Sequence, residues 1–270
     1  MKRVLILAIA GACAVAGVAW TATRHSARAT FRVCADPNNL PFSNERGEGF
    51  ENRIAALIAG DLGERVEYTW WAQRRGFARN TLNAGNCDVI LGVPIGYGMA
   101  RTTRAYYRST YVFVTRHDRA LHIASLDDPM LRKLRIGVHL IGDDYANSPA
   151  AHSLARRGMT NNVVGYTLYG DYSQANPPAR LIEAVEKGDI DVAVAWGPLA
   201  GYFAKLASVP LDLSPVTPQQ DGAMQYAFDI AMGVRRRDST RSTLLNAELT
   251  RRQADIDRIL GDFGVPLLTR

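Results

Sequence analysis

The chain has 270 residues, of which 47% are hydrophobic, and this length and composition fit a globular protein with a sizeable core. Its formal net charge is +6, but four of the 32 basic residues and none of the 26 acidic residues lie within residues 1–29. The remainder is close to neutral, which argues against nucleic acid as a partner.

Residues 1–29 have the pattern of an export signal. Lys2 and Arg3 precede an uncharged apolar run from Val4 to Trp20, and Ala27-Arg28-Ala29 is a small-x-small cleavage site. We expect the mature chain to begin at Thr30, to be exported, and to have no stable membrane insertion once the signal is removed. Because the apolar run reaches the short limit for a membrane span, an uncleaved anchor is the alternative.

The first part of the mature sequence alternates short apolar runs with helical patterns. Four apolar residues between positions 54 and 62 recur at helical spacing, and Gly63 follows them as a candidate C-cap. The turn cluster Asp36-Pro37-Asn38-Asn39 ends the first strand. The predicted elements are strand 31–35, helix 51–62, strand 66–71, helix 74–85 and strand 88–93.

Two later runs, 106–115 and 224–234, predict strands that leave the first part of the chain and return to it. Residues 210–221 are Pro-rich and predict a loop, and 243–260 predicts a final amphipathic helix. Between the two runs we predict strand 134–140, helix 149–157, strand 163–168, helix 178–187, strand 191–196 and helix 197–206.

Both halves of the chain thus begin with a strand and a polar loop and continue as alternating helices and strands. This order predicts an α/β fold of two lobes, joined by two crossover strands around a cleft. The predicted divisions are a signal segment at 1–29, lobe 1 at 30–113 and 223–270, and lobe 2 at 114–222.

Removal of the signal segment, which contains Cys13, leaves Cys34 and Cys87. Adjacent parallel strands could bring the two together in an oxidising compartment. Their positions at opposite strand ends could also separate them beyond the roughly 4.4–6.8 Å between Cα atoms that a bridge needs. A disulfide and two buried free thiols are therefore both open, whereas no His or Cys lies at metal-ligand spacing from either cysteine.

Ligands of open α/β sheets bind beyond the carboxyl ends of the strands, so the loops that follow the predicted strands are candidate binding regions. Their aromatic and polar side chains fit a small-molecule site and equally an interface with a protein partner. Of Trp70 and Trp71, one should point inward, because neighbours on a strand face opposite sides. The candidate cleft residues are Asp36, Asn38, Asn39, Phe42, Trp71, Tyr97, Arg101, Arg104, Asp143, Asp144, Tyr169, Asp171 and Trp196.

Motifs for catalysis and cofactor binding are missing from the sequence. It contains no G-x-S-x-G, H-E-x-x-H or P-loop pattern, and no G-x-G-x-x-G follows a predicted strand. The five histidines are scattered. Asp143-Asp144 could act as paired acids or as metal ligands, although a loop that caps the next helix is the simpler interpretation. We therefore predict no enzyme, no bound cofactor and no metal site.

Several stretches carry a family resemblance over almost all of residues 31–204: RVCADPNNLPFSN, GFENRIAALIA, CDVILGVP, TTRAYYRSTYVFVTR, RIGVHLIGDDYAN, GYTLYGDY, PPARLIEAV and DVAVAWGPLAGYFA. With them the chain resembles the type II periplasmic solute-binding proteins of ABC importers. Within that superfamily it resembles most the J-type proteins encoded with PQQ-dependent methanol dehydrogenases. The resemblance implies a two-lobed fold and a periplasmic location.

One departure from the amino-acid-binding members of the superfamily bears on the ligand. In those proteins an Arg soon after the third strand pairs with the ligand carboxylate, and here that loop has the sequence Ile95-Gly96-Tyr97-Gly98. Arg101 and Arg104 come later in the chain. Without this bidentate clamp, a standard amino-acid ligand is disfavoured and a protein partner is favoured.

The resemblance implies a non-enzymatic accessory protein that assists the assembly or activation of a PQQ-dependent methanol dehydrogenase in methanol oxidation. The dehydrogenase would engage the mouth of the cleft and its aromatic side chains. The alternative is a substrate-binding protein that delivers a small polar solute to an ABC transporter. Ligand-dependent stabilisation would separate the second hypothesis from the first.

Overall fold

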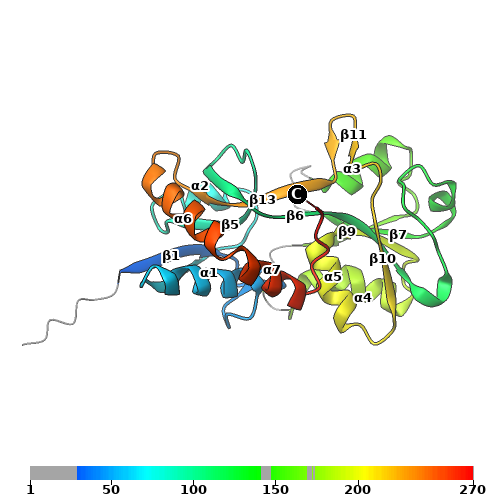
Figure 1. Cartoon of the computed structure of the whole chain (residues 1–270). Helices are drawn as coiled ribbons and strands as arrows, with labels where there is room; N and C mark the ends of the chain where they lie inside the picture. The colour runs from blue at the N-terminus through cyan, green and yellow to red at the C-terminus, as the bar shows by residue number, and fades with distance from the viewer. Residues whose placement is uncertain (1–28, 141–146, 169–171, 173, 270) are drawn as a thin grey trace, which may run out of the picture.

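The computed structural model describes residues 29–140, 147–168, 172 and 174–269, so nearly all of the predicted signal segment lies outside the described residues. Two α/β lobes lie side by side, and the strands β6 (Arg101–Arg116) and β13 (Ala227–Val234) run between them (Figure 1). The predicted fold class, two lobes joined by two crossover strands, is confirmed.

One nine-stranded sheet extends through both lobes, in the order β4-β1-β5-β13-β6-β9-β7-β8, with β10 also pairing with β6. The long strand β6 pairs with β13 up to Thr110 and with β9 from Tyr111 onward, so it belongs to both lobes. The parallel strands are β1 (Thr30–Ala35), β4 (Arg65–Trp70) and β5 (Val89–Pro94) in lobe 1, and β7 (Ile136–Leu140), β8 (Val163–Thr167) and β9 (Val192–Trp196) in lobe 2.

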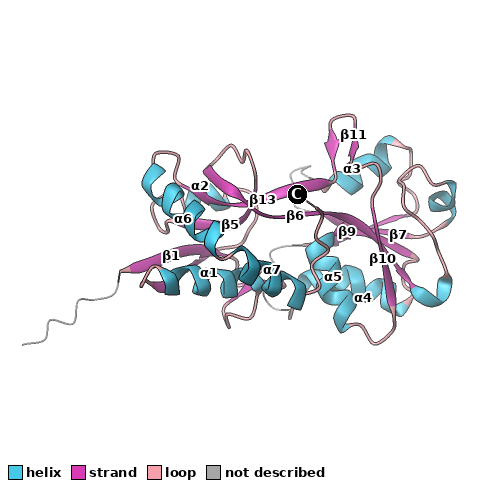
Figure 2. Cartoon of the chain, viewed as in Figure 1, coloured by secondary structure: helices cyan, strands magenta, loops and turns pink. Residues whose placement is uncertain are grey.

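Helices pack against this sheet in both lobes, as Figure 2 shows. In helix α1, Phe50, Ile54 and Ile58 face the core of lobe 1 and are fully buried, as the helical spacing predicts. The other helices are α6 (Ser239–Arg251) and α7 (Gln253–Asp262) in lobe 1, and α3 (Pro149–Arg156), α4 (Arg180–Lys187) and α5 (Gly197–Leu206) in lobe 2, with α1 itself at Phe50–Asp61.

Short elements complete the described chain. Two small hairpins stand apart from the main sheet, one after β1 and one before β13. These elements are β2 (Asn38–Asn39), β3 (Ser43–Asn44), β11 (Gln220–Asp221), β12 (Met224–Gln225), α2 (Phe77–Asn80), and the 3-10 helices η1 (His117–Arg119), η2 (Pro129–Lys133) and η3 (Pro177–Ala179).

The Pro-rich segment 210–221 is partly strand, so the prediction of a loop is wrong there. Strand β10 (Leu211–Pro215) runs antiparallel to β6 and pairs Leu213 with Val114. It is an edge strand, and an edge position tolerates a proline because no further neighbour needs its missing N–H. The alternation of Leu211, Asp212 and Leu213 was the available sequence signal.

The predicted final helix 243–260 is two helices, because α6 ends at Arg251 and α7 begins at Gln253. Between them, the Arg252 guanidinium donates to both oxygens of Asp61 on α1, at 2.6 and 2.5 Å, and to Asp255 at 3.0 Å. The ion pair with α1 is a tertiary contact, so helical periodicity alone did not predict the break. The predicted helix 74–85 also shortens to the single turn of α2.

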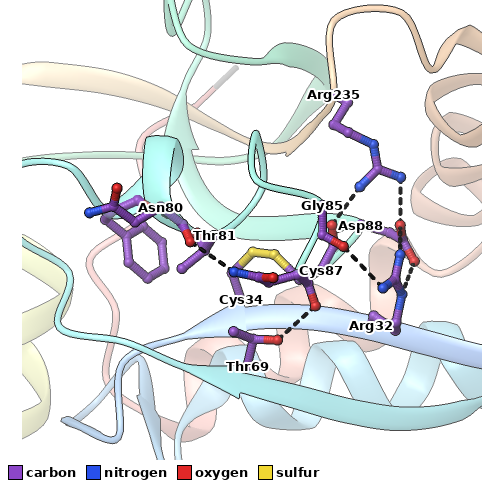
Figure 3. Close-up of a disulfide and its surroundings, with 11 residues drawn as sticks. Arg32, Cys34, Thr69, Asn80, Thr81, Gly85, Cys87, Asp88 and Arg235 are labelled. Atoms are coloured by element: carbon purple, nitrogen blue, oxygen red, sulfur yellow. Dashed lines mark hydrogen bonds and ion pairs between the residues drawn. A yellow bond between two sulfur atoms is a disulfide. The ribbon is translucent and has the colours of Figure 1, made fainter.

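Cys34 and Cys87 form a disulfide in the structure, with their Cα atoms 5.5 Å apart (Figure 3). The sequence left a disulfide and two free thiols open, and the structure shows the disulfide. Val33 of β1 pairs with Val89 of the adjacent parallel strand β5, and Cys87 lies just before β5, in the segment whose Cα comes within bridging distance of Cys34. The bridge lies among buried apolar residues such as Leu82 and Ile90.

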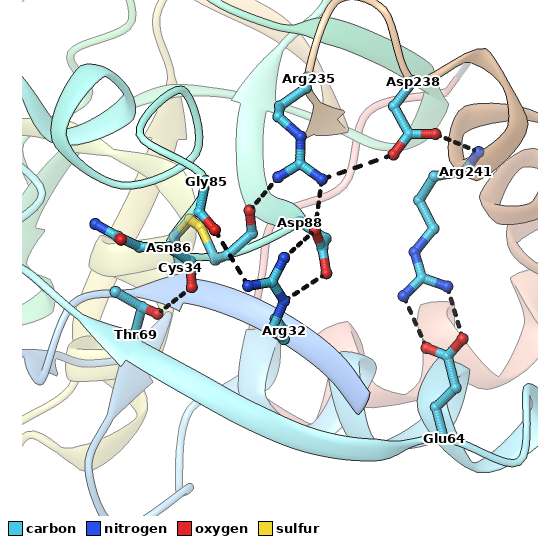
Figure 4. A network of polar contacts seen from close by, with 11 residues as sticks. Arg32, Cys34, Glu64, Thr69, Gly85, Asn86, Asp88, Arg235, Asp238 and Arg241 are labelled. Atoms are coloured by element: carbon cyan, nitrogen blue, oxygen red, sulfur yellow. Dashed lines mark hydrogen bonds and ion pairs between the residues drawn. A yellow bond between two sulfur atoms is a disulfide. The ribbon is translucent and has the colours of Figure 1, made fainter. Parts of the chain in front are cut away.

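A polar network continues from the disulfide across the outer end of lobe 1 (Figure 4). Arg32 of β1 donates to both oxygens of Asp88, at 2.9 and 2.7 Å. Arg235, which follows β13, donates to the same carboxylate at 2.6 Å and to the Cys87 carbonyl at 2.6 Å. Asp88 therefore links β1 and the end of β13, and the adjoining Arg235 is engaged in structure rather than free for a ligand.

Candidate functional site

A cavity of about 340 Å³ lies between the two lobes. Lobe 1 contributes residues of the first loop, including Asn39 and Phe42, and the first turn of α1 with Glu51. The crossover strands contribute Tyr111 and Phe228. Lobe 2 contributes His139, Ser148, Leu168, Trp196 and Leu199. Both lobes and both crossovers therefore build one wall around the same space.

The start of α1 places Phe42 and Glu51 side by side in this wall. The Glu51 amide donates to the Phe42 carbonyl at 2.9 Å. A Cβ on Gly49 would lie 2.0 Å from that carbonyl oxygen, so only glycine permits the loop to approach the helix so closely. The loop and the first turn of α1 are thus fixed to each other by backbone contacts.

Glu51 is a buried carboxylate that faces the cavity. Its residue is 7% exposed, and no Lys, Arg or His among the described residues forms an ion pair with it. Burial raises the pKa of its carboxyl to about 8. The Gly92 backbone, at φ +75°, lies against the carboxylate, since a Cβ on Gly92 would be 2.2 Å from Oε1 of Glu51.

Aromatic side chains form much of the remaining wall. The ring centroids of Trp196 and Tyr111 are 5.5 Å apart, and those of Trp196 and Phe228 are 5.7 Å apart. Phe42 and Tyr107 line the same cavity from lobe 1. Burial and the nearby Glu51 raise the pKa of Tyr107 well above its ordinary value, so its phenol remains neutral.

The polar groups opposite Glu51 carry no positive charge. His139 is 5% exposed, and burial lowers the pKa of its imidazole to about 4, so it is neutral near pH 7. Its Nε2 lies 3.3 Å from the Pro178 carbonyl oxygen. No Lys or Arg is among the described residues that line the cavity.

Asn39 adds a second acceptor to the wall. Its Nδ2 donates to Oε1 of Gln73 at 3.0 Å, whereas its buried Oδ1 has no hydrogen-bond partner among the described residues. Buried acceptors are usually paired, so an unpaired one beside a cavity is a candidate contact for a ligand.

Asp36 holds the first loop in shape. Its Oδ1 accepts from the Asn38 amide at 2.9 Å and its Oδ2 from the Gln73 amide at 2.7 Å. Desolvation is the largest influence on its carboxyl and raises its pKa. Two contacts span the lobes here, because Tyr172 Oη lies 3.4 Å from Asp36 Oδ2 and Asn38 Nδ2 donates to the Gln174 carbonyl at 2.9 Å.

The structure brings three of the sequence-predicted site residues into the cavity wall, namely Asn39, Phe42 and Trp196. Asp36 and Asn38 lie in the adjoining loop and act on its shape. Asp143, Asp144, Tyr169 and Asp171 lie outside the described residues.

Four other predicted residues do not line the cavity. Trp71 is 44% exposed, while Trp70 packs on the core of lobe 1, so one tryptophan of the pair points inward as expected. Tyr97 packs beside the disulfide cluster. The Arg101 Nε donates to the Arg236 carbonyl at 3.1 Å, and Arg104 Nη1 donates to Thr250 Oγ1 at 2.6 Å.

Sequence reasoning missed Glu51 and the aromatic residues of the crossover strands. A signal for Glu51 was present, because it lies three and seven positions before the buried Ile54 and Ile58, on the apolar side of α1. An acid on that side of a helix must be buried or must face a cavity. Tyr111 and Phe228 lay inside predicted strands, where sequence did not show which face opens on the cleft.

Comparison with known proteins places the chain in a family. No protein-family model matches it. Over 97% of this chain and 92% of its own length, the protein MoxJ of Methylorubrum extorquens is 34% identical. The chain belongs to the MoxJ family. The predicted resemblance to J-type proteins is confirmed by this match.

Solved structures agree with membership of the MoxJ family. The periplasmic binding protein XoxJ of Methylobacterium extorquens AM1 superposes with a TM-score of 0.73 at 34% identity, covering 89% of this chain and all of XoxJ. MxaJ of Methlophaga aminisulfidivorans MPT superposes with a TM-score of 0.74 at 27% identity, covering 88% and 100%. The type II periplasmic binding-protein fold and the periplasmic location are therefore confirmed for this MoxJ-family chain.

The alternative to a cleaved signal, an uncleaved anchor at residues 4–20, lies outside the described residues. Within residues 29–140, 147–168, 172 and 174–269, no helix combines the length and the apolar character needed to cross a membrane.

Proposed function

We propose that this MoxJ-family protein is a non-enzymatic accessory protein that assists the assembly or activation of a PQQ-dependent methanol dehydrogenase in the periplasm. The observation that carries the proposal is the 34% identity to MoxJ over 97% of the chain. The cavity wall supports it, since the described lining lacks the Arg or Lys with which an amino-acid carboxylate would pair.

A surface for the dehydrogenase is available beside the mouth of the cleft. Trp71 and Tyr172 are 44% and 47% exposed. The Trp71 amide donates to the Ala35 carbonyl at 2.9 Å, and Tyr172 Oη lies 3.4 Å from Asp36 Oδ2, so both flank the same loop. One aromatic residue comes from each lobe, and exposed Trp and Tyr are enriched at protein interfaces.

The test is capture of the purified dehydrogenase by the mature protein, residues 30–270. Trp71→Ala is expected to weaken capture at least tenfold, about 1.4 kcal/mol, because it removes an interfacial aromatic anchor. Leu206→Ala is the matched control, since Leu206 is 63% exposed at the far end of α5 and should leave capture unchanged.

Two outcomes would contradict the accessory role. One is the absence of association between the wild-type protein and either the apo or the PQQ-loaded dehydrogenase. The other is full dehydrogenase activity in a strain that lacks the gene for this protein. Equal capture by Trp71→Ala and wild-type protein would reject this surface while leaving the partner in place.

The second candidate function is delivery of a small polar solute to an ABC importer. The interlobe cavity favours it, because its volume of about 340 Å³ falls at the lower end of the roughly 300–1,000 Å³ typical of ligand pockets. Loss of solute uptake on deletion of the gene, with intact dehydrogenase activity, would support this role over the first.

A further inference from the structure

The described cavity wall has an acid that can ionise but no base that is charged near pH 7. Glu51 is the acid in the described lining, and neither Lys nor Arg is present there. His139 is neutral near pH 7 because burial lowers its pKa to about 4. In the ligand-free protein the pKa of about 8 keeps the Glu51 carboxyl mostly protonated near pH 7. A negatively charged ligand would meet this acid with no cation beside it and would be disfavoured, whereas a positively charged ligand would lower the pKa and favour the carboxylate.

The carboxylate of Glu51 is also held in place without a partner. Its amide bonds to Phe42, its side chain lies against the Gly92 backbone, and no described residue donates a hydrogen bond to its oxygens. The unpaired Oδ1 of Asn39 belongs to the same wall. Asn39 Oδ1 lacks a donor and Glu51 lacks a cation at the same cavity, which favours a ligand that brings a hydrogen-bond donor and a positive charge.

The aromatic residues favour an organic cation over a metal ion. Among the described residues, five aromatic side chains line the space, namely Phe42, Tyr107, Tyr111, Trp196 and Phe228. Ring faces attract ammonium groups by cation–π interaction. Calcium and magnesium require about six or more oxygen ligands, which one carboxylate and one amide oxygen do not supply.

We infer that the interlobe cavity binds a small organic ammonium ion, with its cationic nitrogen beside Glu51 and its alkyl groups against the aromatic wall. The contacts between Asp36 and Tyr172 and between Asn38 and Gln174 join the lobes through the loop that follows β1, which favours a small ion over a chain segment. This inference does not rest on the accessory role, because it concerns the isolated protein.

The test is calorimetric titration of the mature protein with choline and tetramethylammonium chlorides, alongside sodium chloride at the same ionic strength. The neutral control is 3,3-dimethylbutan-1-ol, which has the shape of choline with carbon in place of the charged nitrogen. We expect the ammonium ions to bind at millimolar or lower concentration, and the alcohol to bind at least tenfold more weakly.

Three variants separate the contributions of the site. Glu51→Gln keeps the shape of the side chain, cannot become a carboxylate when the cation binds and should weaken ammonium binding at least tenfold. Trp196→Leu removes a ring from the wall and should weaken it by a smaller factor. Glu183→Gln is the matched control, because Glu183 pairs with Lys187 on the exposed side of α4. This variant should bind the ammonium ions with the same affinity as the wild type.

The inference is overturned if choline and its neutral isostere bind equally well, or if neither ammonium ion binds at about 10 mM. It is also overturned if a folded Glu51→Gln protein keeps the wild-type affinity. The comparison of choline with the alcohol uses the wild-type protein, so it decides the question even if a variant does not fold. Capture of the dehydrogenase is measured separately, so the two proposals fail independently.

Discussion

Glu51 is buried on the core-facing side of α1, and its carboxyl group also lines the interlobe cavity. It follows Phe50 in the first turn of α1, and both side chains are buried. Burial of a carboxylate without a cation disfavours its charged form, which is why its pKa rises to about 8. The stability of the protein should therefore depend on pH through this residue.

Between pH 4.5 and 8 the folded protein keeps a proton on Glu51 that the unfolded chain has released, so stability falls as pH rises. For His139, with its pKa lowered from 6.5 to about 4, the unfolded chain binds the extra proton, so stability rises with pH up to 6.5. The two effects oppose each other up to pH 6.5, and above it Glu51 acts without this opposition.

We therefore predict that the free energy of unfolding of the ligand-free protein falls by about 1–2 kcal/mol more in wild type than in Glu51→Gln between pH 6.5 and 8. Urea unfolding at several pH values measures this difference. Glu183→Gln should follow the wild-type curve. Parallel curves for wild type and Glu51→Gln would show that the Glu51 carboxyl has the same pKa in the folded and unfolded chains.

Residue-level prediction from the sequence succeeded where a residue's role follows from its place after a strand. Asn39, Phe42 and Trp196 were predicted as cleft residues because they follow or end strands, and they line the cavity. Arg104 was predicted on the same basis, yet it bonds to Thr250 of α6 on the outer surface. The difference arises because the long strand β6 begins at Arg101, so Arg104 is part of a strand.

At the scale of elements, the disulfide joins strand β1 to the residues that lead into strand β5. It closes a long loop, with Cys34 and Cys87 separated by 53 residues, and such a bridge restricts the unfolded chain. Because Cys13 lies in the predicted signal, the mature chain has two cysteines, and both belong to this bridge.

We predict that Cys34→Ala/Cys87→Ala lowers the free energy of unfolding by about 2–5 kcal/mol, as measured by urea denaturation. The denatured wild-type protein should show no free thiol until a reductant is added. A thiol alkylating agent without reductant is the control and should leave the unfolding midpoint unchanged. Two titratable thiols in the unreduced protein would contradict the bridge.

At the scale of the whole molecule, the lobes meet along more than the crossover strands. Gly201 of α5 in lobe 2 lies against Gly264, which follows α7 of lobe 1, and a Cβ on Gly201 would be 2.0 Å from the Gly264 carbonyl oxygen. Ser109 Oγ donates to the Pro266 carbonyl at 2.6 Å in the same region. The C-terminal segment therefore packs against α5 of lobe 2 and adds a contact between the two lobes.

Two alanine substitutions test this contact. In an open helical position, replacing Gly by Ala stabilises a protein by roughly 0.5–1 kcal/mol. Gly60→Ala in α1 should show this gain, because no atom lies within 4 Å of the new Cβ. Gly201→Ala should instead destabilise the protein by about 1–3 kcal/mol, since backbone must move. Equal thermal midpoints for both variants would show that the lobes do not meet here.

The lobe boundaries after residues 113 and 222 stay a proposal. The first boundary falls within β6, because this strand belongs to both lobes. The chain passes from lobe 1 to lobe 2 along β6 and returns to lobe 1 through the segment that leads into β13, so two boundaries divide it.

The sequence alone determined the α/β class, the two lobes, the crossover strands and the family, since these depend on local periodicity and on long ordered motifs. Only the tertiary structure decided the disulfide, the strand β10, the break at Arg252 and the cavity around Glu51. Each of these depends on strand register or on contacts between residues far apart in sequence. Hydrophobic periodicity records which face of an element is buried, and it does not record which other element covers that face.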